Sequence, residues 1–163
     1  MKKILIIAAL AVSAAGLQAG DAPFFQASLT PDIAIHTKTT EIRGISLSIW
    51  GENPQTGLAL GFVNGSTGDS GGVMWGWVNY SQDSYVGWQN SIVNFSKGKF
   101  TGLQSGMVNY AQECHGLQWG LVNYAEKLDG VQIGLANIAI NNGWFDEFPS
   151  KLAKGFVFVN WSF

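Results

Sequence analysis

A short repeat in register over about residues 44–139 constrains the fold more than any other feature of this chain. Each copy reads Gly, an apolar residue, two variable residues, Gly, an apolar residue, Val and Asn, then an aromatic residue and a polar break. The Asn residues recur at steps of 15, 15, 15, 14 and 14, and the first Gly of each copy keeps step with them. The two series are Gly57, Gly72, Gly87, Gly102, Gly116 and Gly130, and Asn64, Asn79, Asn94, Asn109, Asn123 and Asn137. This regularity predicts one repetitive domain in which the two series have a structural role.

Each copy has the alternation of a β-strand. In GLQWGLVNYA, residues 116–125, one parity holds Leu117, Trp119, Leu121, Asn123 and Ala125, and the other holds Gly116, Gln118, Gly120, Val122 and Tyr124. Alternate side chains of a strand point to opposite faces, so one face is bulky and apolar and the other is small or polar. A helix is disfavoured, because each internal Gly would cost it about 1 kcal/mol.

Strand length and alternation favour a membrane barrel. Strands of about nine to eleven residues are long enough to cross a bilayer when tilted. Spanning strands must pair on both edges, and they turn apolar residues to lipid and polar residues inward. Eight segments fit: 41–50, 56–64, 71–80, 85–95, 99–110, 115–125, 129–140 and 154–163. The sequence therefore predicts an all-β fold, a small antiparallel transmembrane β-barrel of about eight strands, with Tyr80, Phe95, Tyr110 and Tyr124 as interface anchors.

The C-terminal segment 154–163 supports the same interpretation. It ends GFVFVNWSF, with Trp161 and Phe163 on one parity and an aromatic residue last. This ending resembles the terminal strand of bacterial outer-membrane barrels. The resemblance implies outer-membrane lipid and the barrel-assembly machinery as partners.

The repeat itself resembles a second group of proteins. GLQSGMVNYA, GLQWGLVNYA and GVQIGLANIA are similar to the GLQIGLVNxA units of bacterial surface-repeat proteins first noted in spirochaetes. The copy GWQNSIVNFS departs from the unit at Ser91, and GISLSIWG lacks the Asn. The resemblance implies a place in the cell envelope and no particular chemistry.

A parallel β-solenoid of 14–15-residue coils is the alternative fold. It stacks each residue on its equivalent in the next coil, so the Asn residues would form a ladder. Successive barrel strands run antiparallel, which would place successive Asn residues at opposite rims and leave their constancy unexplained. Against the solenoid stands its thin core, since Trp75, Trp77, Trp88 and Trp119 would have to fit inside or lie exposed. A soluble antiparallel barrel or sandwich is a third possibility.

The N-terminus predicts export. Residues 1–20 read MKKILIIAALAVSAAGLQAG, with a basic start, an apolar middle and small residues at the end, as in a signal peptide. An N-terminal anchor helix is the less favoured interpretation. The mature protein is expected to be a single β-repeat domain, residues 21–163. Its formal charge of −2 offers no basic surface for nucleic acid.

Catalytic and metal-binding motifs are sparse. Cys114 and His115 are adjacent, so on a strand they point to opposite faces and are badly placed to share a proton. Glu113 and His115 are too few ligands for a metal site. We therefore expect no enzymatic activity, no cofactor and no metal.

The function predicted from sequence is a non-catalytic outer-membrane or cell-surface protein with a structural or surface-binding role. The alternative is a secreted β-solenoid that binds a surface or a partner by its flat face. A row of exposed Asn could bind a glycan, but Asn at strand ends more often bonds nearby backbone and begins a turn.

Overall fold

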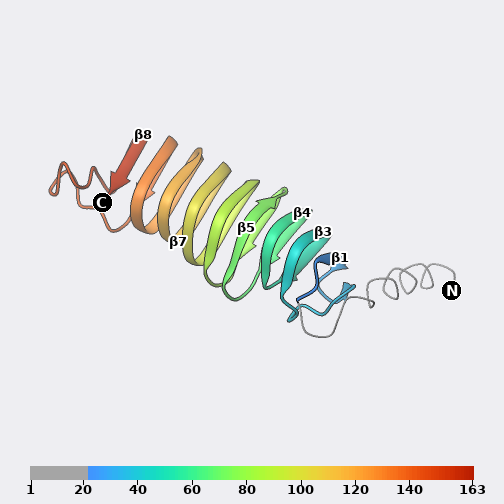
Figure 1. The fold of residues 1–163 in the computed structure, drawn as a ribbon. Helices are drawn as coiled ribbons and strands as arrows, with labels where there is room; N and C mark the ends of the chain where they lie inside the picture. Colours follow the sequence, from blue (N-terminus) through green and yellow to red (C-terminus); the bar gives the residue numbers. More distant parts are fainter. Residues whose placement is uncertain (1–21) are drawn as a thin grey trace.

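Successive repeats of this chain pair in parallel, and the chain winds into a stack of coils. The computed structural model describes residues 22–163, so the predicted signal peptide of residues 1–20 lies outside them. Figure 1 shows the coils following one another from the N-terminal end to the C-terminal end. The fold is all-β and is a β-solenoid, not a barrel.

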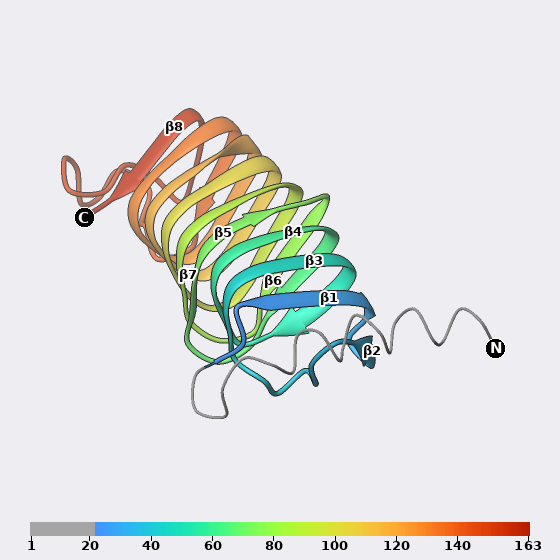
Figure 2. The ribbon, with the colours of Figure 1, turned by 45° about the vertical axis from the view of Figure 1, so that its right-hand side comes forward.

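The strands give the register of the stack. They are β1 (Phe25–Thr30), β2 (Ile33–Ala34), β3 (Ile42–Asn53), β4 (Gln55–Ser66), β5 (Ser70–Trp75), β6 (Val78–Ser81), β7 (Tyr85–Ala139) and β8 (Gly155–Ser162). β7 is continuous extended chain that winds through several coils (Figure 2). Equivalent residues of neighbouring coils face one another: Gly57 pairs with Gly72, and Asn64 pairs with Asn79.

The prediction of a transmembrane barrel is wrong because its strand order requires antiparallel neighbours. Each polar break instead carries the chain around the coil, so the next copy begins beside the start of the previous one and runs in the same direction. Only this parallel arrangement places equivalent Asn residues of successive coils side by side. Their constancy, which the barrel left unexplained, follows directly from parallel stacking.

The assignment of faces from strand parity is confirmed for the first half of each repeat and is wrong for the second half, where Asn123 and Ala125 are buried although they share the parity of Trp119, and Val122 is exposed although it shares the parity of Gly120. The small and polar parity points into the solenoid, where Gln89, Gln104, Gln118 and Gln132 have no exposed surface. The apolar parity points outward, so the four tryptophans Trp75, Trp77, Trp88 and Trp119 lie exposed rather than filling a core. The apolar part of the interior is a narrow column that includes Tyr85, Phe100, Cys114 and Leu128.

The repeated first Gly permits close stacking of the backbone. Each member of the series has a positive φ, such as 141° at Gly116, a region that L side chains rarely adopt. A Cβ on Gly116 would lie 2.2 Å from the carbonyl oxygen of Gly102, and one on Gly130 would lie 2.0 Å from that of Gly116. Any side chain here would push neighbouring coils apart.

Antiparallel strands close both ends of the stack. β2 pairs with β1 at the N-terminal end, and β8 pairs with the last coil of β7 at the other (Figure 1). Trp161 faces Val131 in this pairing, and its indole nitrogen donates to the carbonyl of Pro149 at 2.8 Å. Phe163 is exposed. The segment 154–163, predicted as a barrel strand, is therefore a cap on the solenoid, and the expectation of a barrel-assembly partner loses its structural basis.

Candidate interaction surface

One side of the solenoid is covered by apolar side chains that we call the apolar face. It consists of three columns of outward-pointing residues that follow the repeat from coil to coil. The columns are Ile45, Leu58, Val73, Trp88, Leu103, Leu117 and Val131; Leu47, Leu60, Trp75, Asn90, Ser105, Trp119 and Ile133; and Ile49, Phe62, Trp77, Ile92, Met107, Leu121 and Leu135. None of these side chains carries a charge.

The apolar face is larger than the usual exposed apolar patch of a monomer. Trp75, Trp77 and Trp119 are 56, 61 and 62% exposed. At about 200 Å² for an aromatic side chain, these three alone present roughly 350 Å² to solvent. The largest apolar patch on a typical monomer is about 300–600 Å², and patches beyond that mark interaction sites. The exposed Leu, Ile, Phe and Met residues of the three columns bring the exposed apolar area of the face above this range.

The two polar residues of the apolar face are bonded to each other. Ser105 Oγ donates to Asn90 Oδ1 at 2.8 Å. The indole nitrogen of Trp88 donates to Ser105 Oγ at 2.7 Å. These bonds lower the cost of covering the face, although the amide N–H groups of Asn90 would lose their contact with water.

An aromatic border separates the apolar face from the charged residues. It is formed by Tyr80, Phe95, Tyr110 and Tyr124. The rings of Phe95 and Tyr110 stack with centroids 4.6 Å apart, and those of Tyr110 and Tyr124 stack at 5.4 Å. The sequence predicted these residues as interface anchors of a barrel; in the solenoid they form a ladder along one edge of the apolar face.

The hydroxyl groups of this border are bonded to carboxylates. Tyr80 donates to Glu52, and Tyr110 donates to Glu126 at 2.6 Å. Burial, with the bond to Glu52, raises the pKa of Tyr80 to about 12. The bond to Glu126, with a smaller effect of burial, raises the pKa of Tyr110 to about 12. Both phenols therefore stay neutral near pH 7.

The charged residues of the coils lie beyond the aromatic border, on what we call the polar edge. It includes Asp69, Asp83, Lys97, Lys99, Glu113, Glu126, Lys127 and Asp129. Neighbouring coils pair some of them: Lys127 Nζ lies 3.4 Å from Glu113 Oε1, and His115 Nδ1 lies 3.0 Å from Asp129 Oδ2. The coil is thus amphipathic in cross-section, with charge confined to one edge.

The recurring Asn residues are not part of any surface. Asn109 Nδ2 donates to Asn123 Oδ1 at 2.8 Å and to the carbonyl of Trp119 at 3.1 Å. The same pattern links Asn64 through Asn137 into one ladder. Gln104, Gln118 and Gln132 form a second ladder inside the coils. These side chains bond across coils rather than starting turns, and their burial leaves none available to a glycan.

The side chains that could act as nucleophiles or metal ligands do not assemble into a reactive site. Cys114 is fully buried while His115 points outward to Asp129, as expected for neighbours on a strand. Burial raises the pKa of Cys114 to about 12, with a further contribution from Asp129, so the thiol is neutral and unreactive. Within residues 22–163, no three His, Cys, Asp or Glu side chains are grouped as a metal site requires. Over the same residues, no helix is long and apolar enough to span a membrane.

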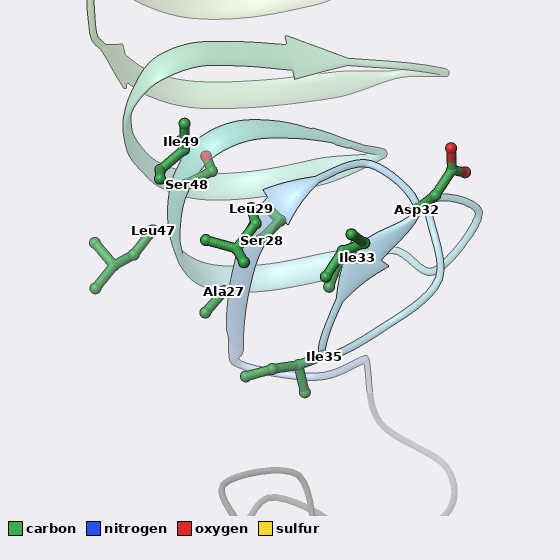
Figure 3. A pocket seen from close by; sticks show the side chains of 10 residues that line it. Ala27, Ser28, Leu29, Asp32, Ile33, Ile35, Leu47, Ser48 and Ile49 are labelled. Carbon is green, nitrogen blue, oxygen red and sulfur yellow. The ribbon is translucent and has the colours of Figure 1, made fainter. Parts of the chain in front are cut away.

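A pocket lies at the N-terminal end of the apolar face (Figure 3). Its volume is about 660 Å³. The lining residues are Ala27, Ser28, Leu29, Asp32, Ile33, Ala34, Ile35, Leu47, Ser48 and Ile49. The sequence did not predict this site, because the segment FFQASLTPDIAIH carries no copy of the repeat. Its alternation of small and large apolar residues was the signal that could have indicated it.

Comparison with known proteins does not assign the chain to a family. No family model, curated protein or solved structure matches it. The similarity to spirochaete surface-repeat proteins therefore stays a prediction from the repeat.

Proposed function

We propose that this protein is an exported, non-catalytic solenoid that binds a lipid surface through its apolar face. One observation carries the proposal: an uncharged face, rich in Trp, runs along the repeats while charge is confined to the polar edge. The predicted signal peptide and the resemblance of the repeat to bacterial surface-repeat proteins favour the cell envelope as the source of that lipid. The protein would lie on the membrane and not span it.

The face suits hydrocarbon better than a specific protein partner. A protein interface carries about one hydrogen bond per 100–200 Å², and these bonds fix its register. The apolar face offers few such bonds, because Ser105 Oγ already donates to Asn90 Oδ1 and the rest of the face is almost entirely hydrocarbon and aromatic. The free indole N–H groups of exposed Trp instead match the headgroup boundary, where Trp and Tyr are enriched.

The aromatic border would set the depth of binding. With the apolar face in the acyl region, Tyr110 and Tyr124 lie at the level of the headgroups and the polar edge lies in water. The formal charge of −2 gives no attraction to anionic lipid. We therefore expect binding to neutral vesicles that changes little with salt, since the interaction is hydrophobic.

Flotation with phosphatidylcholine vesicles tests the proposal. The full chain should float with vesicles at low and high salt. Trp77→Asp should weaken binding by about 3 kcal/mol, or roughly a hundredfold, because about 120 Å² of apolar surface is lost at about 25 cal/mol per Å². Gln112→Asp, on the polar edge, is the matched control and should float like the wild type.

Two outcomes would overturn the proposal. One is a wild-type protein that stays with the aqueous fraction in the absence of detergent. The other is a dimer, seen by sedimentation, that Trp77→Asp converts to monomer while vesicle binding is absent throughout. The second outcome would make the apolar face a contact between two copies of the chain.

A further inference from the structure

The pocket at the end of the apolar face exists because a small residue interrupts a column of large ones. β1 pairs in parallel with β3, so Ala27 lies beside Leu47 and extends the column that continues through Leu60 and Trp75. β2 pairs antiparallel with β1 and places Ala34 beside Ser28. The two alanines leave a hollow between larger neighbours.

The walls of this hollow are hydrocarbon. Leu29, Ile33, Ile35, Leu47 and Ile49 surround it, as Figure 3 shows. Their exposure is high for such residues, for instance 54% at Ile33 and 53% at Ile49, so the hollow opens to the outside. Leu47 and Ile49 also belong to the apolar face, which makes the pocket and the face one continuous apolar surface.

The pocket has few polar groups. Ser48 Oγ donates to Asn64 Oδ1 at 3.5 Å, and Ser28 Oγ is buried without a hydrogen-bond partner. Asp32 is highly exposed, and its Oδ1 lies 3.8 Å from Lys38 Nζ. A ligand that enters the hollow therefore meets hydrocarbon and finds few partners for polar groups of its own.

We propose that this pocket holds one acyl chain, taken from the lipid surface that the apolar face covers; this deepens the proposed function and rests on it. The volume of about 660 Å³ lies within the roughly 300–1,000 Å³ of small-molecule sites, which is room for a flexible hydrocarbon chain. Continuity with the apolar face lets the chain enter from the bilayer without crossing water, while its headgroup stays near the Asp32–Lys38 rim.

Titration of the full chain with dansyl-labelled undecanoic acid tests the proposal. We expect saturable binding of one probe per chain, with a blue shift of the dansyl emission. Ala27→Trp fills the hollow and should weaken binding at least tenfold. Gln112→Trp puts the same side chain at an exposed position of the polar edge, outside the pocket and the apolar face, and should bind the probe like the wild type.

A second pocket variant covers the case in which Ala27→Trp fails to fold. Ile33→Asp places a charge on an exposed rim residue and should also weaken binding at least tenfold. Equal binding by the wild type and a folded pocket variant, or binding that does not saturate, would overturn the proposal.

Competition and flotation separate the two sources of the chain. If lysophosphatidylcholine displaces the probe more strongly than palmitate does, the ligand of the pocket is a lipid of the surface. If palmitate displaces it more strongly, the ligand is a free fatty acid, and the membrane source is overturned. Ala27→Trp should still float with vesicles, because the apolar face is intact. Probe binding without vesicle binding would overturn the proposed function and leave a pocket for free fatty acid.

Discussion

Replacing Asn109 with Ala should show how much the buried amide ladder stabilises the stack. Asn109 lies in the middle of the ladder and has no exposed surface. Its Oδ1 accepts from Asn94 Nδ2 at 2.8 Å, and its Nδ2 donates to Asn123 Oδ1 at 2.8 Å and to the carbonyl of Trp119 at 3.1 Å. The substitution removes all three bonds at once.

The magnitude follows from these contacts. Three hydrogen bonds at about 1 kcal/mol each give about 3 kcal/mol. Asn94 Nδ2 keeps its bond to the carbonyl of Ser105, but Asn123 Oδ1 is left buried without a donor, which adds about 1–3 kcal/mol. We expect a loss of about 4–6 kcal/mol in the free energy of unfolding.

Urea unfolding followed by tryptophan fluorescence and circular dichroism measures this loss. Asn90→Ala is the control: its side chain is half-buried on the apolar face and accepts one bond, from Ser105, so the loss should be about 1 kcal/mol or less. A solenoid need not unfold in one step, because each coil contacts only its neighbours, so both probes are compared for every variant. If Asn109→Ala cost no more than Asn90→Ala, the ladder would add nothing beyond solvation by water, and the reasoning would fail.

Three further predictions test other features of the stack. Gly116→Ala should prevent folding or cost several kcal/mol in urea unfolding, because its Cβ would lie 2.2 Å from the carbonyl oxygen of Gly102. Gly68→Ala, at φ 61° with only Pro54 Cβ nearby at 4.0 Å, should cost about 1 kcal/mol, and similar losses for the two variants would contradict the close-stacking role of Gly116. Cys114 should resist iodoacetamide in the folded protein and react in urea, as mass spectrometry can show, because its thiol is buried and neutral; rapid native labelling would refute its placement. The raised pKa of Cys114 stabilises the fold fully below pH 9, where the unfolded thiol titrates, and this stability should fall between pH 9 and 12 by up to about 1.4 kcal/mol per pH unit. Cys114→Ala should show a shallower fall in stability over that range, and an unchanged slope would contradict the assignment.

Strand parity predicted the two faces of the first half of each repeat, but neither the corner that turns Asn123 inward nor how the strands associate. The alternation of Trp119 and Gly120 fixes two faces in either fold, because side chains alternate in any strand. Parallel and antiparallel association differ in what equivalent residues meet. The constancy of Asn109 and Asn123 carried that information, since only parallel stacking brings the two amides within 2.8 Å.

The weight given to buried hydrophobic residues misled the choice of fold. In a solenoid the tryptophans had to fit into a thin core or lie exposed, and both outcomes counted against that fold. The structure has the second outcome: amides such as Gln104 and Gln118 fill the interior by bonding to each other at 2.8 Å, and Trp119 lies outside. Hydrogen-bonded ladders across coils are long-range contacts that a single copy of the repeat does not reveal.

The pocket could not have been predicted from the repeat, because it depends on pairing between non-repeated segments. The small side chain of Ala27 leaves a hollow only because β1 lies between β3, which carries Leu47, and β2. In contrast, the separation of Cys114 from His115 was predictable, because neighbouring residues on a regular strand point to opposite faces.

In-register stacking gives this molecule a length that is set by its number of coils. Neighbouring coils are spaced by about 4.8 Å, and the coils that begin at Gly57 through Gly130 offer their neighbours the same Gly and Asn positions. Gain or loss of one repeat of 14 or 15 residues would therefore lengthen or shorten the solenoid by one coil without disturbing either cap. Each coil also contributes one residue to each column of the apolar face. On the proposed function, duplication or deletion of repeats would thus raise or lower membrane affinity, while the pocket beside Leu47 stays the same.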